Sequence, residues 1–192
     1  MTTDSVATTG KAIAILVADG FEESQLTDAQ RFFLERGLEP KIVGQEGILV
    51  HGWHEGGWGH HFMTDAKLSE VLSADFAALL LPDGPQSIAT LARDPHAKRL
   101  VKAFVETDKP VAVLGHAVSL LQVAEVASGR TVAGAEATRE AVTIEGGATW
   151  SEEPLVIDSN LITTANGSEL PQVLATLVTK AGVPEPEVDQ AA

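Results

Sequence analysis

The stretch PVAVLGHAVSLL, residues 110–121, contains a short apolar run that leads directly into a helical pattern. A strand that turns straight into a helix lifts one residue above the carboxyl end of a parallel sheet, where α/β hydrolytic enzymes hold a Ser or Cys nucleophile. The raised residue here is Gly115, which has no side chain, and the chain contains no cysteine. The stretch therefore predicts an α/β fold whose nucleophile position carries no nucleophile.

Short apolar runs alternate with helical patterns along the rest of the chain. Expected strands cover Lys11–Ala18, Lys41–Val43, Phe76–Leu81, Leu155–Ile157 and Leu161–Thr163, and expected helices cover Glu23–Arg36, Pro95–Glu106, Val118–Val126, Ala137–Ile144 and Leu170–Lys180. Parallel strands joined by right-handed helical crossovers form sheets with helices on both faces. The alternation therefore predicts a doubly wound parallel α/β sheet.

The two ends of the chain depart from this alternation. Residues 1–10 are polar and lack the basic and apolar segments of a signal peptide, which predicts a disordered N-terminus and a cytoplasmic protein. Residues 183–192 are rich in proline and acidic side chains and predict a flexible tail. A single domain is therefore expected over residues 11–182.

The charge of the chain restricts its partners. The formal net charge is -14, whereas nucleic-acid phosphates and anionic membranes require surfaces rich in Lys and Arg. No apolar run approaches the roughly 20 residues that a membrane span needs. We therefore expect neither nucleic acid nor membrane as a partner, and the absence of cysteine excludes disulfides and thiolate metal ligands.

Residues 47–61, GILVHGWHEGGWGHH, follow the second predicted strand and concentrate glycine, tryptophan and histidine. Such a composition predicts a hairpin or excursion loop. One hypothesis is a metal site, because three imidazole or carboxylate ligands and a water suit Zn. The candidate ligands are His51, His54, His60 and His61, with Glu55 or Asp65 as an oxygen ligand.

The spacing of these histidines matches no standard metal motif. Side chains alternate along a strand, so a hairpin sends His60 and His61 to opposite faces. The alternative interpretation is a polar, aromatic loop, or a contact between protein copies through Trp53 and Trp58.

Four segments of the chain resemble the ThiJ/PfpI superfamily, whose members are related to class I glutamine amidotransferase domains. They are ILVADGFEESQL (residues 15–26), LLPDG (80–84), KPVAVLGH (109–116) and WSEEPLVIDSNLIT (150–163). The order of the segments is consistent over about residues 11–182. The resemblance implies a flavodoxin-like, three-layer sandwich with a small hairpin excursion, and a homodimer, as is common in that family.

The resemblance also implies roles for single residues. Glu22 corresponds to the glutamate that hydrogen-bonds the catalytic Cys, and His116 to the histidine beside it; the backbone N–H groups of Gly84 and His116 would form the oxyanion site. Gly115 stands where the family has its Cys, so the covalent chemistry does not carry over. Asp83 replaces a Gly and brings a carboxylate close to where negative charge would develop, which would weaken anion stabilisation.

A second resemblance concerns the segment VADGFEESQL, residues 17–26. It is similar to the start of the C-terminal domain of large-subunit catalases, which has this fold and likewise lacks a working Cys site. The fold therefore persists elsewhere without the thiol.

Three functional hypotheses follow. The first is a non-catalytic relative that binds a small molecule or partner through Asp83, Gly84, Gly115 and His116; it predicts that Gly115→Ala leaves stability near normal. The second is a Cys-independent hydrolase, hydratase or lyase in which Glu22 activates a water and His116 assists. The third is a metal-binding protein that uses the histidines of residues 51–61. Under the first two hypotheses we expect no cofactor.

Overall fold

The computed structural model describes residues 12–45 and 47–183. The strands are β1 Ala12–Leu16, β2 Phe21–Glu22, β3 Glu39–Gly44, β4 Leu49–His54, β5 Gly57–Met63, β6 Ala66–Lys67, β7 Ala78–Leu81, β8 Val111–Leu114, β9 Thr131–Val132, β10 Thr149–Trp150, β11 Leu155–Asp158 and β12 Leu161–Thr164. The α-helices are α1 Glu23–Leu34, α2 Pro85–Leu91, α3 Pro95–Glu106, α4 Ser119–Val123 and α5 Leu170–Lys180. The predicted ends, residues 1–10 and most of 183–192, lie outside the described residues.

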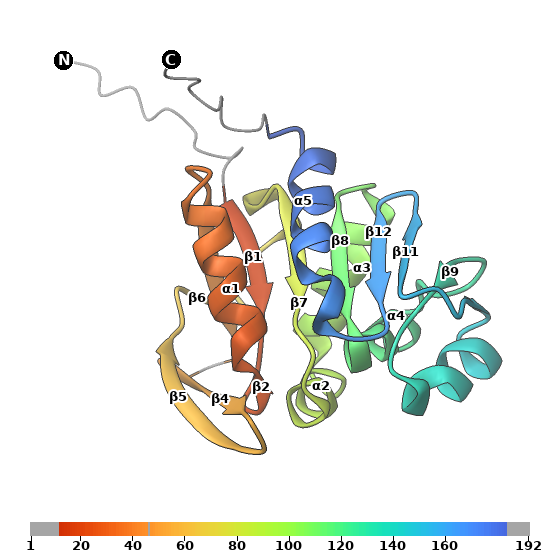
Figure 1. The fold of residues 1–192 in the computed structure, drawn as a ribbon, viewed down its shortest axis with the longest axis horizontal. Helices are drawn as coiled ribbons and strands as arrows, with labels where there is room; N and C mark the ends of the chain where they lie inside the picture. The colour runs from red at the N-terminus through yellow and green to blue at the C-terminus, as the bar shows by residue number, and fades with distance from the viewer. Residues whose placement is uncertain (1–11, 46, 184–192) are drawn as a thin grey trace.

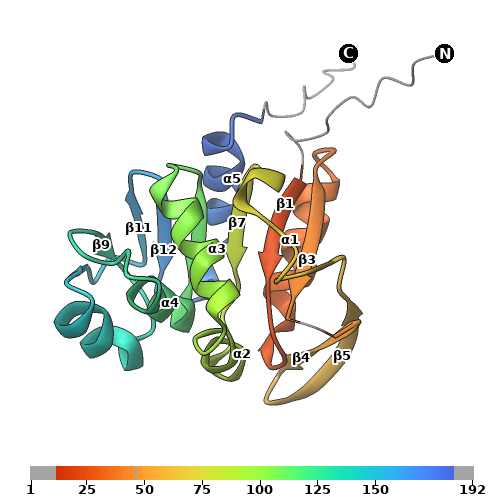
Figure 2. The same cartoon turned by 180° about the vertical axis from the view of Figure 1, so that it is seen from behind.

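A seven-stranded sheet in the order β11-β12-β8-β7-β1-β3-β6 forms the centre of the molecule. All neighbouring strands pair in parallel except β11, which runs antiparallel to β12 at one edge. Helices α1 and α5 cover one face of the sheet (Figure 1), and α2, α3 and α4 cover the other (Figure 2). The structure confirms the predicted flavodoxin-like, doubly wound sandwich.

Both faces of the central strands are apolar because helices cover both. In β1, Ile13 and Ile15 pack into the core beneath α1 and α5, whereas Ala14 and Leu16 pack into the core on the opposite face. Side chains alternate along a strand, so a strand buried on both faces must be apolar at every position. This is the physical origin of the unbroken apolar runs in the sequence.

The predicted hairpin is present between β3 and β6. Strands β4 and β5 pair antiparallel, and β4 also pairs with the short strand β2, which makes a separate three-stranded sheet at one corner of the molecule (Figure 1). The ladder shifts register between His51 and Trp53. The hairpin therefore lies directly against the segment that leads into α1.

Two predicted helices have a different form. The helix expected over Val118–Val126 is a 3-10 turn, Gly115–Val118, followed by the short helix α4, and the one expected over Ala137–Ile144 is a 3-10 turn, Glu136–Thr138, and a π-helical turn, Ala141–Glu145. Within the described residues, no helix has the length and apolar character needed to cross a membrane.

Candidate functional site

Gly115 lies where β8 ends and the 3-10 turn Gly115–Val118 begins, at the carboxyl edge of the sheet. The residue is buried and its φ is 54°, in the left-handed region. Glycine adopts this conformation without the steric cost that a Cβ imposes on other residues. The strand-turn-helix geometry expected from the sequence is therefore present at Gly115.

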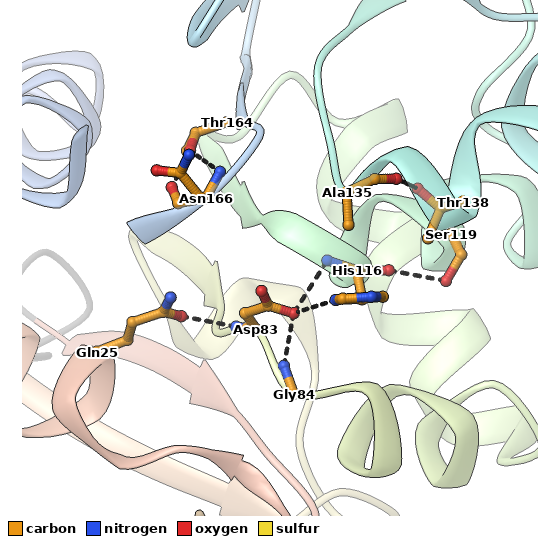
Figure 3. A network of polar contacts seen from close by, with 9 residues as sticks. All are labelled: Gln25, Asp83, Gly84, His116, Ser119, Ala135, Thr138, Thr164 and Asn166. Carbon is orange, nitrogen blue, oxygen red and sulfur yellow. Dashed lines mark hydrogen bonds and ion pairs between the residues drawn. The ribbon is translucent and has the colours of Figure 1, made fainter. Parts of the chain in front are cut away.

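Asp83 follows the neighbouring strand β7 and directs its carboxylate at this turn (Figure 3). Its Oδ1 accepts hydrogen bonds from the backbone N–H groups of Gly84, at 2.6 Å, and His116, at 3.0 Å. The same oxygen lies 2.9 Å from Nδ1 of the His116 ring. A carboxylate only accepts hydrogen bonds, so this contact places a proton on Nδ1.

The Asp83 carboxylate occupies the space that a side chain at position 115 would need. A Cβ added to Gly115 would overlap Oδ2 of Asp83 and lie 2.5 Å from its Cγ and 2.9 Å from its Oδ1. Real Cβ atoms do not approach other heavy atoms so closely, so one of the two groups would have to move. Gly115 and Asp83 are therefore a sterically matched pair.

The two backbone N–H groups expected to form an oxyanion site are both in use. Gly84 and His116 donate to one oxygen of the protein's own carboxylate rather than facing an empty position. The negative charge of Asp83 also lies where a transition-state oxyanion would develop. The site is thus filled internally by a carboxylate of the same chain.

Glu22 lies at the end of β2, beside Asp83. Its backbone N–H donates to the Asp83 carbonyl at 2.8 Å, and its Oε1 accepts a hydrogen bond from the Ser24 hydroxyl at 2.8 Å. Glu22 and Asp83 both line a cavity of about 600 Å³ between α1 and the start of α5. The remaining lining residues are Ser24, Gln25, Asp28, Arg31, Phe32, Glu35, Gly167, Leu170, Pro171 and Leu174.

Gln25 is a site residue that the sequence analysis missed. It is buried in α1, lines the cavity, and accepts a hydrogen bond from the backbone N–H of Asp83 at 2.7 Å (Figure 3). Helical spacing alone placed residue 25 on α1 without showing its partner. A polar residue close to the apolar face of that helix is the only signal that the sequence contains.

The hairpin histidines have separate partners. His51 stacks on His61, with ring centroids 3.9 Å apart, and also on Trp58, while His60 binds Glu23. Nε2 of His54 lies 4.0 Å from the exposed Glu55 carboxylate. Within residues 12–45 and 47–183, no three His, Asp or Glu side chains form a group that could hold a metal ion. The geometry thus gives the zinc hypothesis no support, and that hypothesis stays a prediction.

Glu23 joins the hairpin to α1. Its buried carboxylate accepts hydrogen bonds from the backbone N–H of His60 and from the His60 ring, both at 2.7 Å. Burial raises the pKa of Glu23, but the hydrogen bonds and the charge of His60 outweigh burial, so the pKa lies below its ordinary value of 4.5. Gly59 makes this approach possible, since an added Cβ there would overlap the Glu23 carboxylate.

Comparison with known proteins identifies the fold around Gly115. The sequence profile of the DJ-1/PfpI family matches residues 11–180. The chain belongs to the DJ-1/PfpI family. The "Putative cysteine protease YraA" of Bacillus subtilis is 31% identical over 161 residues, which are 83% of this chain and 92% of that protein.

Another DJ-1/PfpI relative is "Protein/nucleic acid deglycase 2" of Escherichia coli, 32% identical over 163 residues, which are 84% of this chain and 92% of that protein. Among solved structures, a ThiJ/PfpI domain protein from Brachyspira murdochii superimposes with a TM-score of 0.80 at 20% identity. The superposition covers 92% of this chain and 99% of the Brachyspira murdochii chain. This likeness shows that the two proteins share a fold.

Proposed function

We propose that this DJ-1/PfpI protein binds a small molecule non-covalently in the cavity that Glu22 and Asp83 line, and performs no thiol chemistry. The observation that carries the proposal is the Asp83 carboxylate, which fills the space of a side chain at position 115 and accepts hydrogen bonds from the backbone N–H groups of Gly84 and His116. The cavity of about 600 Å³ next to it has the size of a small-molecule site.

Acyl or carbonyl chemistry through a thiol needs two things at this turn. It needs a thiolate, which a chain without cysteine does not contain, and free donors for the developing oxyanion. The names of the relatives, a cysteine protease and a deglycase, describe those proteins; a thiol-dependent form of either activity does not fit this chain.

A specific observation favours a second candidate, a Cys-independent hydrolase, hydratase or lyase. Glu22 lines the cavity and its carboxylate has the Ser24 hydroxyl as a hydrogen-bond donor, so this carboxylate is the candidate to accept a proton from a water. Across the turn, the Asp83 contact engages Nδ1 of His116, so Nε2 is the ring nitrogen left for proton transfer.

Turnover by the wild type and by Glu22→Gln decides between the two candidates. The substrates are an α-ketoaldehyde panel and simple esters, amides and nitriles, and we expect no turnover by either protein. Turnover by the wild type that Glu22→Gln abolishes would replace the binding proposal with the enzyme.

Binding itself is tested by NMR with a fragment library and isotope-labelled protein. We expect fragments that shift the amide signals of Glu22, Gln25 and Gly167, because these residues line the cavity. A library from which no fragment shifts those signals would contradict the proposal. Elemental analysis gives a separate check: stoichiometric zinc, lost in His54→Ala and His60→Ala, would support the metal hypothesis instead.

A further inference from the structure

The Gln25 side chain presents a hydrogen-bond donor to the cavity. The residue is only 5% exposed, and its Oε1 accepts from the backbone N–H of Asp83 at 2.7 Å. A backbone N–H can only donate, so this contact fixes which end of the amide is oxygen. The NH2 group therefore points away from the Asp83 backbone, as Figure 3 shows. Nε2 lies close to Gly167, where an added Cβ would be 2.9 Å away.

This NH2 group has no hydrogen-bond partner among the described residues. Among the described residues, every side-chain nitrogen or oxygen that is completely buried has a hydrogen-bond partner. Nε2 of Gln25 has no partner, so it is not completely buried and is reached from the cavity that Gln25 lines. Two N–H bonds on an otherwise buried side chain call for an acceptor oxygen on the molecule that enters.

Two residues with carboxylates, Glu22 and Asp83, line the same cavity as this donor. Asp83 Oδ1 takes three hydrogen bonds, whereas Oδ2 takes none from the described residues, and the Glu22 carboxylate takes one from Ser24. The three groups converge on the Asp83 backbone, which donates its N–H to Gln25 and accepts the N–H of Glu22. The lining of the cavity thus includes one donor and two anionic acceptors.

The charge and the apolar lining of the cavity limit the ligand further. Asp28 and Glu35 add negative charge, and the one lining cation, Arg31, already pairs with Asp28. Phe32 and three residues at the start of α5, Leu170, Pro171 and Leu174, supply an apolar wall. An anionic molecule would be repelled here, while a cation with an apolar substituent is complementary.

We infer that the ligand is a small organic cation. It carries a primary ammonium group, an oxygen on a nearby carbon that accepts a hydrogen bond, and an apolar substituent. The ammonium binds the carboxylates of Glu22 and Asp83, the oxygen accepts from Gln25, and the substituent packs on Phe32 and Leu174. This assignment rests on the proposed binding function and adds the class of ligand to it.

The test titrates the full chain with the methyl ether of leucinol, whose ether oxygen only accepts hydrogen bonds. The comparison compounds are the amine 2-methylheptan-4-amine, in which a methylene replaces the ether oxygen, the N-acetyl derivative of the ether, which lacks the positive charge, and leucine, in which a carboxylate replaces the methoxymethyl group. We expect the ether to bind roughly fivefold or more tightly than the amine, because one hydrogen bond is lost, and the other two compounds to bind more weakly still.

Two near-isosteric variants separate the contacts. Glu22→Gln should weaken binding of the ether and the amine alike, by roughly tenfold or more, because a charge-assisted contact is removed. Gln25→Glu keeps the oxygen that faces Asp83 but removes the N–H donor, so the preference for the ether over the amine should disappear. The matched control is Glu106→Gln on α3, in the opposite helical layer, which should leave both affinities unchanged.

The outcomes distinguish the ligand class from the binding function. Equal affinity for ether and amine, or undiminished binding of the N-acetyl compound, overturns the assignment. Neutral or anionic fragments that shift the cavity signals without binding of the ether overturn the class and leave the binding function standing. A cavity that no fragment enters removes both.

Discussion

Replacing Gly115 with alanine tests the steric match between this residue and Asp83. The sequence alone suggested that Gly115→Ala would leave stability near normal, whereas the structure leads us to expect a destabilised variant. The new Cβ would lie 2.5 Å from Cγ of Asp83, so the carboxylate must move and its hydrogen bonds with Gly84 and His116 must change.

The expected cost has two parts. A non-glycine residue at φ 54° costs about 1–2 kcal/mol, and an added carbon in a filled site costs about 1–3 kcal/mol. Together they lower the free energy of unfolding by about 2–5 kcal/mol. Gly129→Ala is the matched control, because Gly129 has φ 74° and nothing within 4 Å of an added Cβ. It should show only the conformational part, about 1–2 kcal/mol.

The assay is urea unfolding of the wild type, Gly115→Ala, Gly129→Ala, Asp83→Gly and the double variant Asp83→Gly/Gly115→Ala. Because Asp83→Gly removes the carboxylate, the double variant should be more stable than the sum of the single changes implies, by about 1–3 kcal/mol. The reasoning is refuted if Gly115→Ala costs no more than Gly129→Ala, or if the two changes are additive within about 0.5 kcal/mol.

Three further predictions concern the turn at Gly115, the β4–β5 hairpin and the oligomeric state. The variant Asp83→Gly/Gly115→Cys contains a single thiol, since the natural chain has no cysteine. Iodoacetamide labelling followed by mass spectrometry should show that this thiol reacts faster than the thiol of Gly115→Cys alone, where the Asp83 carboxylate crowds and repels the thiolate. Equal rates would contradict the steric and electrostatic argument. Glu23→Gln should destabilise the protein by about 1.5–3 kcal/mol at pH 7, since a charged acceptor is lost. The folded-state pKa of Glu23 is lowered, so its contribution is present above pH 4.5 and is lost as the pH falls below it; a difference between wild type and variant that stays constant from pH 7 to pH 3 would be inconsistent with this. Light scattering coupled to size exclusion should give twice the chain mass of 20.2 kDa if the chain forms the homodimer common in its family, and a mass of one chain would contradict that expectation.

Much of the fold could be predicted from local patterns. The apolar runs of β1, β7 and β8 are long enough and sufficiently rich in Ile, Val and Leu to indicate strands buried on both faces, and the residues between them have helical spacing. The short strands β2, β6 and β10 were not predicted, because two residues carry no periodicity and pair only where tertiary contacts bring a partner. The π-helical turn at Ala141–Glu145 is likewise invisible in a pattern that fits a helix of any type.

The candidate site could be predicted only in outline. Gly115 was visible because it follows a strand and precedes a helix, and Asp83 because it follows another strand. Their contact depends on β7 and β8 being neighbours in the sheet, which the order of elements along the chain does not state. The role of Gln25 was hidden for the same reason, since its partner lies 58 positions away in the sequence.

The sequence by itself determined that this chain forms a doubly wound α/β domain with no thiol and no side chain at its nucleophile position, because periodicity and composition are local properties. Only the tertiary structure decided what occupies that position. Strand order set Asp83 beside Gly115, and the absence of a Cβ left room for the carboxylate to reach the two N–H groups. Side-chain contacts between separate elements depend on distance in space, and a single sequence does not encode that distance in any local pattern.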